Sequence, residues 1–177
     1  ARILCDFGEA AKARRVAEAA LEKDADNVEA LVVAGSVDRD TGNLVRAKER
    51  CDRAVELDAK SVPALFALAR TLAASGSGPA AMQMYGRVLG LLPDDPLALY
   101  ERGAVAAHLD LDKQAWADWD KAFQQQPEWK RDFNGGFYGR REKYEHEIVM
   151  VSAELSEKPN DGDLLLRRGR YFRWAGR

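Results

Sequence analysis

Few residues of this sequence have the types and spacing that catalysis or metal binding needs. The two histidines, His108 and His146, lack a second ligand four residues away, the spacing that puts two metal ligands on one helix face. The two cysteines, Cys5 and Cys51, show neither metal-ligand spacing nor a disulfide framework, so the cytosol is the default compartment. The glycine-rich stretch 76–79 lacks the Lys-Ser/Thr of a phosphate-binding loop, and no Gly-x-Ser-x-Gly motif is present. The sequence therefore predicts no enzymatic activity, no metal and no cofactor.

The densest positive charge lies near the C-terminal end of the sequence. It consists of Arg167, Arg168, Arg170, Arg173 and Arg177. Three of them, Arg170, Arg173 and Arg177, share one helix face through their spacing of three and four residues. Such a face can bind an acidic peptide or a phosphate through bidentate hydrogen bonds. The alternative, which we favour, is an ordinary solvated helix face.

Composition and charge argue against nucleic acid and membrane as partners. The 177 residues carry a formal net charge of −2, which gives no electrostatic reason to bind nucleic acid. The tryptophans Trp116, Trp119, Trp129 and Trp174 could stack on bases, but no clustered positive charge accompanies them over residues 28–129, and we expect packing roles. No run of 18 apolar residues is present, so no membrane-spanning helix is expected, and no signal peptide is visible.

The elements that must position these residues recur with a period of about 34 residues, a length typical of helical repeats. Gly8, Gly42 and Gly76 are evenly spaced at this period, and Asp110 takes the next place. The other series are Ala13, Ala47, Ala81 and Ala115; Ala17, Cys51, Tyr85 and Trp119; Ala20, Ala54, Val88 and Ala122; Leu31, Leu65 and Leu99, each followed four residues later by Gly35, Ala69 or Gly103; and Ala25, Ala59, Pro93 and Pro127. A shared period of this length predicts stacked helix pairs, each burying its apolar face on its neighbours.

These residues resemble the tetratricopeptide repeat family, whose pattern is two helices with small residues at fixed places and a closing proline. The best copy, 96–129, carries Leu99, Gly103, Ala115, Trp119, Ala122 and Pro127 at the family positions. The resemblance implies an all-α fold, a right-handed superhelix (α-solenoid) of stacked antiparallel helix–turn–helix repeats. Departures from the pattern are Asp38 in place of a tyrosine, Asp110 in place of the turn glycine, and Ala25 and Ala59 in place of the proline.

The period divides the chain, taken as one solenoid over 1–177. We expect a partial repeat at 1–27 (its second helix from about Glu9 to Lys23), full repeats at 28–61, 62–95 and 96–129, a degenerate repeat at 130–161, and a partial repeat at 162–177. In the degenerate repeat, the glycine-rich segment 133–139 is a poor first helix by propensity, whereas 140–157 has one apolar face typical of a helix. Because both ends of the sequence fall inside a repeat, we expect a longer chain around it. We also expect that copies can associate through the partial repeats.

The resemblance also implies a concave groove lined by the first helix of each repeat. The residues placed on it are Glu29, Val32, Val33, Ser36 and Arg39; Phe66, Arg70 and Ala73; Leu97, Tyr100, Glu101, Ala104 and His108; and Leu166, Arg170 and Arg173. A mixed apolar and charged lining suits an extended peptide or a partner helix. The family's clamp for a C-terminal carboxylate is not expected, because its positions hold Val32, Ser36, Ala67, Leu97 and Glu101, without Lys, Arg or Asn.

The sequence thus predicts a scaffold that binds another protein or peptide in this groove. Two alternatives remain open. The chain can be a structural spacer within a longer repeat array, or a regulatory arm of a larger protein whose catalytic or targeting domain lies outside these residues.

Overall fold

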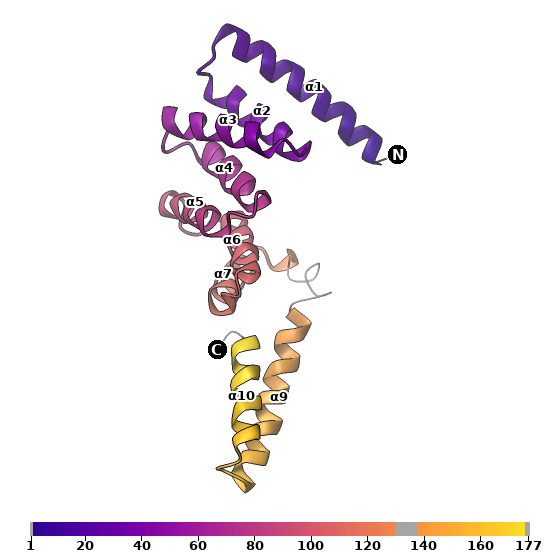
Figure 1. The fold of residues 1–177 in the computed structure, drawn as a ribbon, viewed down its shortest axis with the longest axis vertical. Coiled ribbons are helices and arrows are strands. Elements are labelled where there is room, and N and C mark those ends of the chain that lie inside the picture. The colour runs from indigo at the N-terminus through magenta and orange to yellow at the C-terminus, as the bar shows by residue number, and fades with distance from the viewer. Residues whose placement is uncertain (1, 130–137, 176–177) are drawn as a thin grey trace. The chain divides into compact units, whose positions relative to one another are not determined.

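The computed structural model describes residues 2–129 and 138–175, and the regular elements within them are α-helices. The chain forms two compact units, residues 1–93 and 94–177. The first unit holds α1 (Arg2–Lys23), α2 (Val28–Asp40), α3 (Leu44–Leu57), α4 (Val62–Ala74) and α5 (Gly78–Leu91). The second holds α6 (Pro96–His108), α7 (Asp112–Gln125), α9 (Tyr138–Glu157) and α10 (Gly162–Trp174). Consecutive helices pack as pairs, α2 on α3, α4 on α5, α6 on α7 and α9 on α10 (Figure 1), which confirms the all-α helical-repeat fold.

A side-chain acceptor starts the first helix of each of the pairs α2–α3, α4–α5 and α6–α7, and another starts α10. The N-cap residues Asn27, Ser61 and Asp95 are evenly spaced at the repeat period, and Asp161 caps α10. Each accepts a hydrogen bond from the backbone N–H three residues on, at 2.9, 3.4, 2.7 and 3.0 Å respectively. Such caps satisfy N–H groups that the helix itself leaves without a partner.

The turns within the pairs repeat just as closely. Gly42 and Gly76 have φ of +83° and +77°, and Asp110 has φ of +56°, which confirms the turn at these three positions and shows that its backbone is left-handed. In each case the residue after the turn position donates its backbone N–H to a carbonyl five residues earlier, at 2.8–2.9 Å. Aspartate tolerates this conformation better than most non-glycine residues, which explains how Asp110 replaces glycine there.

Small residues on one helix of a pair face a larger side chain on the other. A Cβ added at Gly35 would lie 2.7 Å from the Sγ of Cys51, and one at Gly103 would lie 2.7 Å from the Nε1 of Trp119. Cys51 and Trp119 are at most 2% exposed, which confirms the expected packing role of Trp119 and shows the same role for Cys51. The alanine column is equally covered, because Ala47, Ala81 and Ala115 are all 0% exposed. The columns therefore mark where two helix backbones approach closely.

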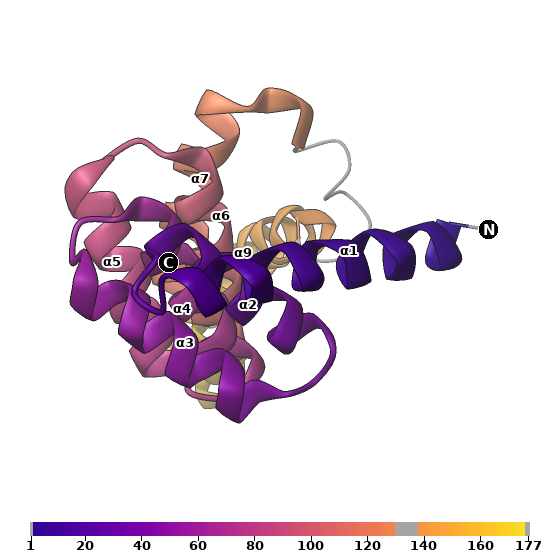
Figure 2. The ribbon, with the colours of Figure 1, turned by 90° about the horizontal axis from the view of Figure 1, so that it is seen from above.

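The first helix of the chain differs from expectation. It runs from Arg2 to Lys23, so Gly8 lies inside α1 and not at a turn. Seen from above, the N-terminal turns of α1 project past α2 (Figure 2).

The second half of the predicted degenerate repeat is helical, as α9. The expected distortion of its first half falls mainly on residues 130–137, outside the described residues. In the part of the chain that the structure describes, no helix combines the length and apolar character needed to cross a membrane.

Candidate functional site

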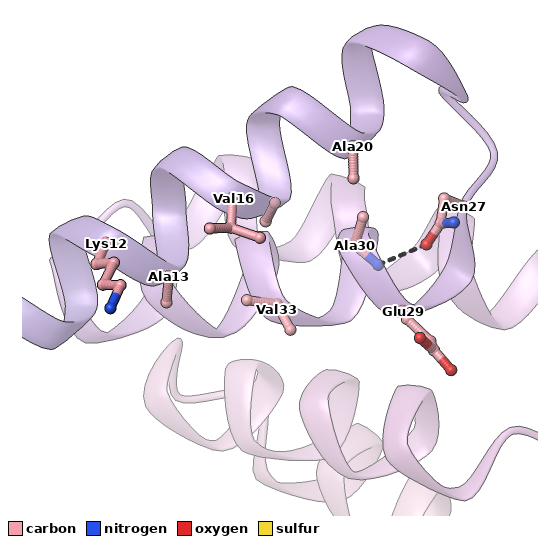
Figure 3. Close-up of a pocket in the computed structure, with 9 residues that line it drawn as sticks. Lys12, Ala13, Val16, Ala20, Asn27, Glu29, Ala30 and Val33 are labelled. Atoms are coloured by element: carbon pink, nitrogen blue, oxygen red, sulfur yellow. Dashed lines mark hydrogen bonds between the residues drawn. The ribbon is translucent and has the colours of Figure 1, made fainter.

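An apolar groove lies between α1 and α2 (Figure 3). Its volume is about 670 Å³. The residues that line it are Lys12, Ala13, Val16, Ala17 and Ala20 from α1, Asn27 at the N-cap of α2, and Glu29, Ala30 and Val33 from α2. Of these, the sequence analysis placed Glu29 and Val33 on the binding surface. Alanines keep the groove open, and Val16 and Val33 are the larger apolar side chains that line it.

The groove residues are more exposed than the residues at equivalent positions of the other repeats. Val16 is 66% exposed and Val33 is 41% exposed, whereas Ala67, the residue equivalent to Val33 in the next repeat, is 3% exposed. Ala13 is partly exposed, although its equivalents Ala47, Ala81 and Ala115 are completely buried. The groove is thus apolar surface of the kind that the other helix pairs cover.

Two charged side chains flank this apolar floor. Lys12 and Glu29 are both exposed, and they come from different helices. Asn27 does not face a ligand with a free oxygen, because its Oδ1 accepts the N–H of Ala30 at 2.9 Å (Figure 3). The arrangement suits an apolar segment with polar edges.

A buried ion cluster ties α1 to the next helix pair. Asp38 is 1% exposed, and its carboxylate accepts hydrogen bonds from Arg14 of α1 and Arg50 of α3, both at 2.8 Å, with Arg46 at 3.6 Å. Glu18 joins the cluster through Arg50 at 2.6 Å and Arg46 at 3.1 Å. The hydrogen bond from Arg50 is the main cause that lowers the pKa of Glu18. The cluster fixes the position of α1, and with it one wall of the groove.

A second buried acid, Asp118, lies in the other unit. It is 2% exposed and receives bidentate hydrogen bonds from Arg102 at 2.6 and 2.7 Å and a third from Gln114 at 2.9 Å. Its saturated hydrogen bonding indicates a structural role. Asp38 and Asp118 were not identified as buried ion-pair sites from the sequence, although Asp38 was noted in place of the family's tyrosine and Asp118 directly precedes Trp119 of a repeat column.

The other predicted binding residues of the first unit are mostly partly buried and have partners of their own. Val32 packs against the core of Leu31, Ala54 and Ala64. Arg39 donates two hydrogen bonds to the neighbouring Asp40. The structure brings two of the set together, since the guanidinium of Arg70 lies over the ring of Phe66 at 5.4 Å. Ser36, also partly buried, lies on α2 between Val32 and Arg39.

The predicted residues of the second unit are more varied. Tyr100 is partly buried, with its ring edge-on to Phe123 and Trp129 at 6.3 and 5.6 Å. His108, in the last turn of α6, is exposed, as are Arg170 and Arg173 on α10. In the C-terminal arginine group, Arg167 pairs with Glu154 of α9 at 2.8 Å, whereas Arg177 lies outside the described residues. Within the described chain, no group of three or more His, Cys, Asp or Glu side chains could hold a metal ion.

Comparison with known proteins agrees with this architecture. Residues 38–103 match the family model described as tetratricopeptide repeat. Among solved structures, MamA has a TM-score of 0.62 with 22% identity, over 96% of this chain and 88% of MamA. A tetratricopeptide repeat protein from Parabacteroides merdae has a TM-score of 0.60 with 23% identity, over 99% and 70%. YrrB, described as a TPR protein with an unusual peptide-binding site, has a TM-score of 0.61 with 18% identity, over 88% and 81%.

Residues 38–103 thus carry the tetratricopeptide repeat that the sequence analysis predicted, and the described helices have the corresponding helical-repeat fold. No curated protein matches the sequence. Proteins of this family generally serve protein–protein interaction and are typically scaffolds without enzymatic activity.

Proposed function

We propose that the chain is a protein-interaction scaffold and that the α1–α2 groove receives a peptide or helical segment of a partner protein. The observation that carries the proposal is the uncovered apolar groove of about 670 Å³, with Val16 and Val33 exposed inside it. Exposed apolar surface with a polar rim is typical of interaction sites. A groove of this form suits an amphipathic helix that lays its apolar side on the floor.

The surface formed by the first helices is a second part of the proposal. It consists of Val32, Ser36, Arg39, Phe66, Arg70, Tyr100, His108, Arg170 and Arg173. The stacked Arg70 and Phe66 side chains support it, because a guanidinium held over a ring presents a flat surface of mixed polar and apolar character.

Site-specific photo-crosslinking in living cells tests the proposal. A photoreactive amino acid is placed at position 33 in the groove and, as a matched control, at position 45, where Val45 is 73% exposed on α3 outside the groove. We expect a crosslinked protein at position 33 that is absent at position 45, identified by mass spectrometry. A third variant carries the crosslinker at position 66.

The three positions separate the outcomes. Crosslinks at 66 but not at 33 would move the binding site to the first-helix surface. Equal crosslinking at 33 and 45, or none at 33 and 66, would refute both surfaces.

A further inference from the structure

Three arginines share two carboxylates in the ion cluster that joins α1, α2 and α3. The cations are Arg14, Arg46 and Arg50, and the carboxylates are those of Asp38 and Glu18. The hydrogen bond from Arg50 lowers the pKa of Glu18, and the charges of Arg46 and Arg14 act in the same direction, so Glu18 is ionised at neutral pH. The cluster therefore carries one positive charge more than its own carboxylates balance.

The three guanidiniums use their hydrogen-bond donors unequally. Arg50 donates Nη1 to Asp38 and Nη2 to Glu18. Arg14 uses only Nη2, and its Nε is buried without a hydrogen-bond partner among the described residues. Arg46 donates Nη2 to Glu18, whereas its Nε lies 3.6 Å from Asp38, beyond hydrogen-bond distance. In the part of the chain that the structure describes, the Nη1 groups of Arg14 and Arg46 thus have no acceptor.

Solvent reaches the two arginines that keep these unused donors. The side chains of Arg14 and Arg46 are 39% and 50% exposed, whereas that of Arg50 is 11% exposed. Both exposed arginines approach the same buried carboxylate, that of Asp38, at 2.8 and 3.6 Å, so their guanidiniums lie close together. Charged donors of this kind bind a carboxylate through short, charge-assisted hydrogen bonds.

An exposed arginine two turns further along α3 shows the opposite balance. Arg53 is 47% exposed, but it donates Nε and Nη2 to Asp26 at 3.0 and 2.8 Å and pairs with Glu56 at 3.3 Å. One cation meets two carboxylates there, so Arg53 does not call for a further anion. The excess of positive charge is therefore a property of the α1–α3 cluster and not of every exposed arginine on this helix.

We propose that Arg14 and Arg46 bind one carboxylate group at the surface of this cluster. A single negative charge balances the excess of one positive charge, whereas a phosphate group, with a charge near −2, would exceed it. The carboxylate belongs either to a small organic acid or to an acidic side chain of another protein, since both present the same group. The site shares no residue with the α1–α2 groove, so it goes beyond the proposed function and can fail without it.

NMR spectroscopy of the arginine Nε–H signals measures binding at each guanidinium separately. Sodium acetate replaces sodium chloride at constant ionic strength, so that general screening stays the same. We expect saturable shifts of the Arg14 and Arg46 signals and no shift of the Arg53 signal.

A second titration distinguishes the two sources of the carboxylate. It uses tetraglutamate with blocked ends, and tetraglutamine with the same ends as its uncharged match. Tighter binding of tetraglutamate than of acetate, with no binding of tetraglutamine, assigns the group to an acidic protein segment. Equal binding of tetraglutamate and acetate assigns it to a small organic acid.

Two variants remove the site in different ways. Arg46→Gln leaves two arginines for two carboxylates, and we expect it to weaken acetate binding at least about tenfold. Thr41→Glu supplies a carboxylate from the chain itself, because Thr41 Oγ1 already accepts a hydrogen bond from Arg14 at 2.9 Å, and it should abolish acetate binding. Arg53→Gln is the matched control and should leave the affinity unchanged. Positions 41 and 46 are both exposed, so we expect folded variants, which far-UV circular dichroism checks.

Four results would overturn the proposal. The first is the absence of saturable shifts at Arg14 and Arg46. The second is an equal shift at Arg53, which would indicate a general salt effect. The third is an acetate affinity that neither Arg46→Gln nor Thr41→Glu changes. The fourth is tighter binding of inorganic phosphate than of acetate, which would contradict the single-charge assignment.

Discussion

Replacing the buried Asp38 and its partner Arg50 by apolar residues tests how the ion cluster supports the fold. The repeat itself suggests the replacement, because the corresponding positions of the next repeat hold Leu72 and Met84. We therefore compare the single variants Asp38→Leu and Arg50→Met with the double variant Asp38→Leu, Arg50→Met.

The structure sets the expected magnitude. Breaking a buried ion pair by removing one partner costs about 3–5 kcal/mol, since the other charge stays buried. Here Arg50 would keep Glu18 at 2.6 Å, and Arg14, whose side chain is 39% exposed, would keep Thr41 at 2.9 Å. We therefore expect Asp38→Leu to lose about 3 kcal/mol, the low end of that range. The double variant should recover at least about 1 kcal/mol, because it removes the stranded guanidinium and restores an apolar pair.

Urea denaturation followed by circular dichroism measures the free energies of unfolding. The control is Asp40→Ala, because Asp40 is 61% exposed and its pair with Arg39 lies on the surface. We expect that control to change stability by less than about 0.5 kcal/mol. If the double variant were as unstable as the sum of its two single changes, the two positions would not be coupled, and the assignment of Asp38 as the centre of the cluster would be wrong.

Three further predictions concern the same helix pairs. Because the pKa of Glu18 is lowered below its usual 4.5, its carboxylate stabilises the fold above that pH and loses this effect as the pH falls through the folded value. Glu18→Gln should therefore reduce stability at about pH 6 more than at about pH 3, and equal losses at both would contradict the shift. Gly103→Ala should cost about 1–3 kcal/mol by forcing Trp119 aside, whereas Gly86→Ala, with open space around it, should gain up to about 1 kcal/mol in thermal or urea unfolding. Ala115→Leu, at a 0% exposed site, should also cost about 1–3 kcal/mol, and an unchanged melting temperature would refute its place in the alanine column.

Much of the fold could be predicted because steric limits leave few residue choices. Only a small residue fits opposite Trp119, and only a residue that tolerates positive φ fits at position 76, so these positions repeat in type as well as in spacing. The N-cap column has the same period but was not predicted. Its members, Asn27, Ser61 and Asp95, differ in identity and share only a side-chain acceptor.

Less of the candidate site than of the fold could be predicted from the sequence. Val33 was expected on the binding surface, but Val16 was not, because the surface was assigned to first helices and α1 is a second-helix type. Whether a side chain such as Val16 is covered depends on a neighbouring helix, and no local pattern in α1 shows it. The burial of Asp38 likewise depends on arginines from two other helices, 24 and 12 residues away.

The matched side-chain sizes across a helix pair also have a consequence for adding, removing or exchanging repeats. Gly35 faces Cys51, and Gly103 faces Trp119, so in both pairs the first helix has a glycine where the side chain of its own second helix needs space. Exchanging single helices between repeats would make a large side chain clash with the opposite helix, or would leave a cavity. Duplication, deletion or grafting of repeats is therefore expected to succeed when both helices of a hairpin are moved together. The hairpin is the smallest unit that can be exchanged.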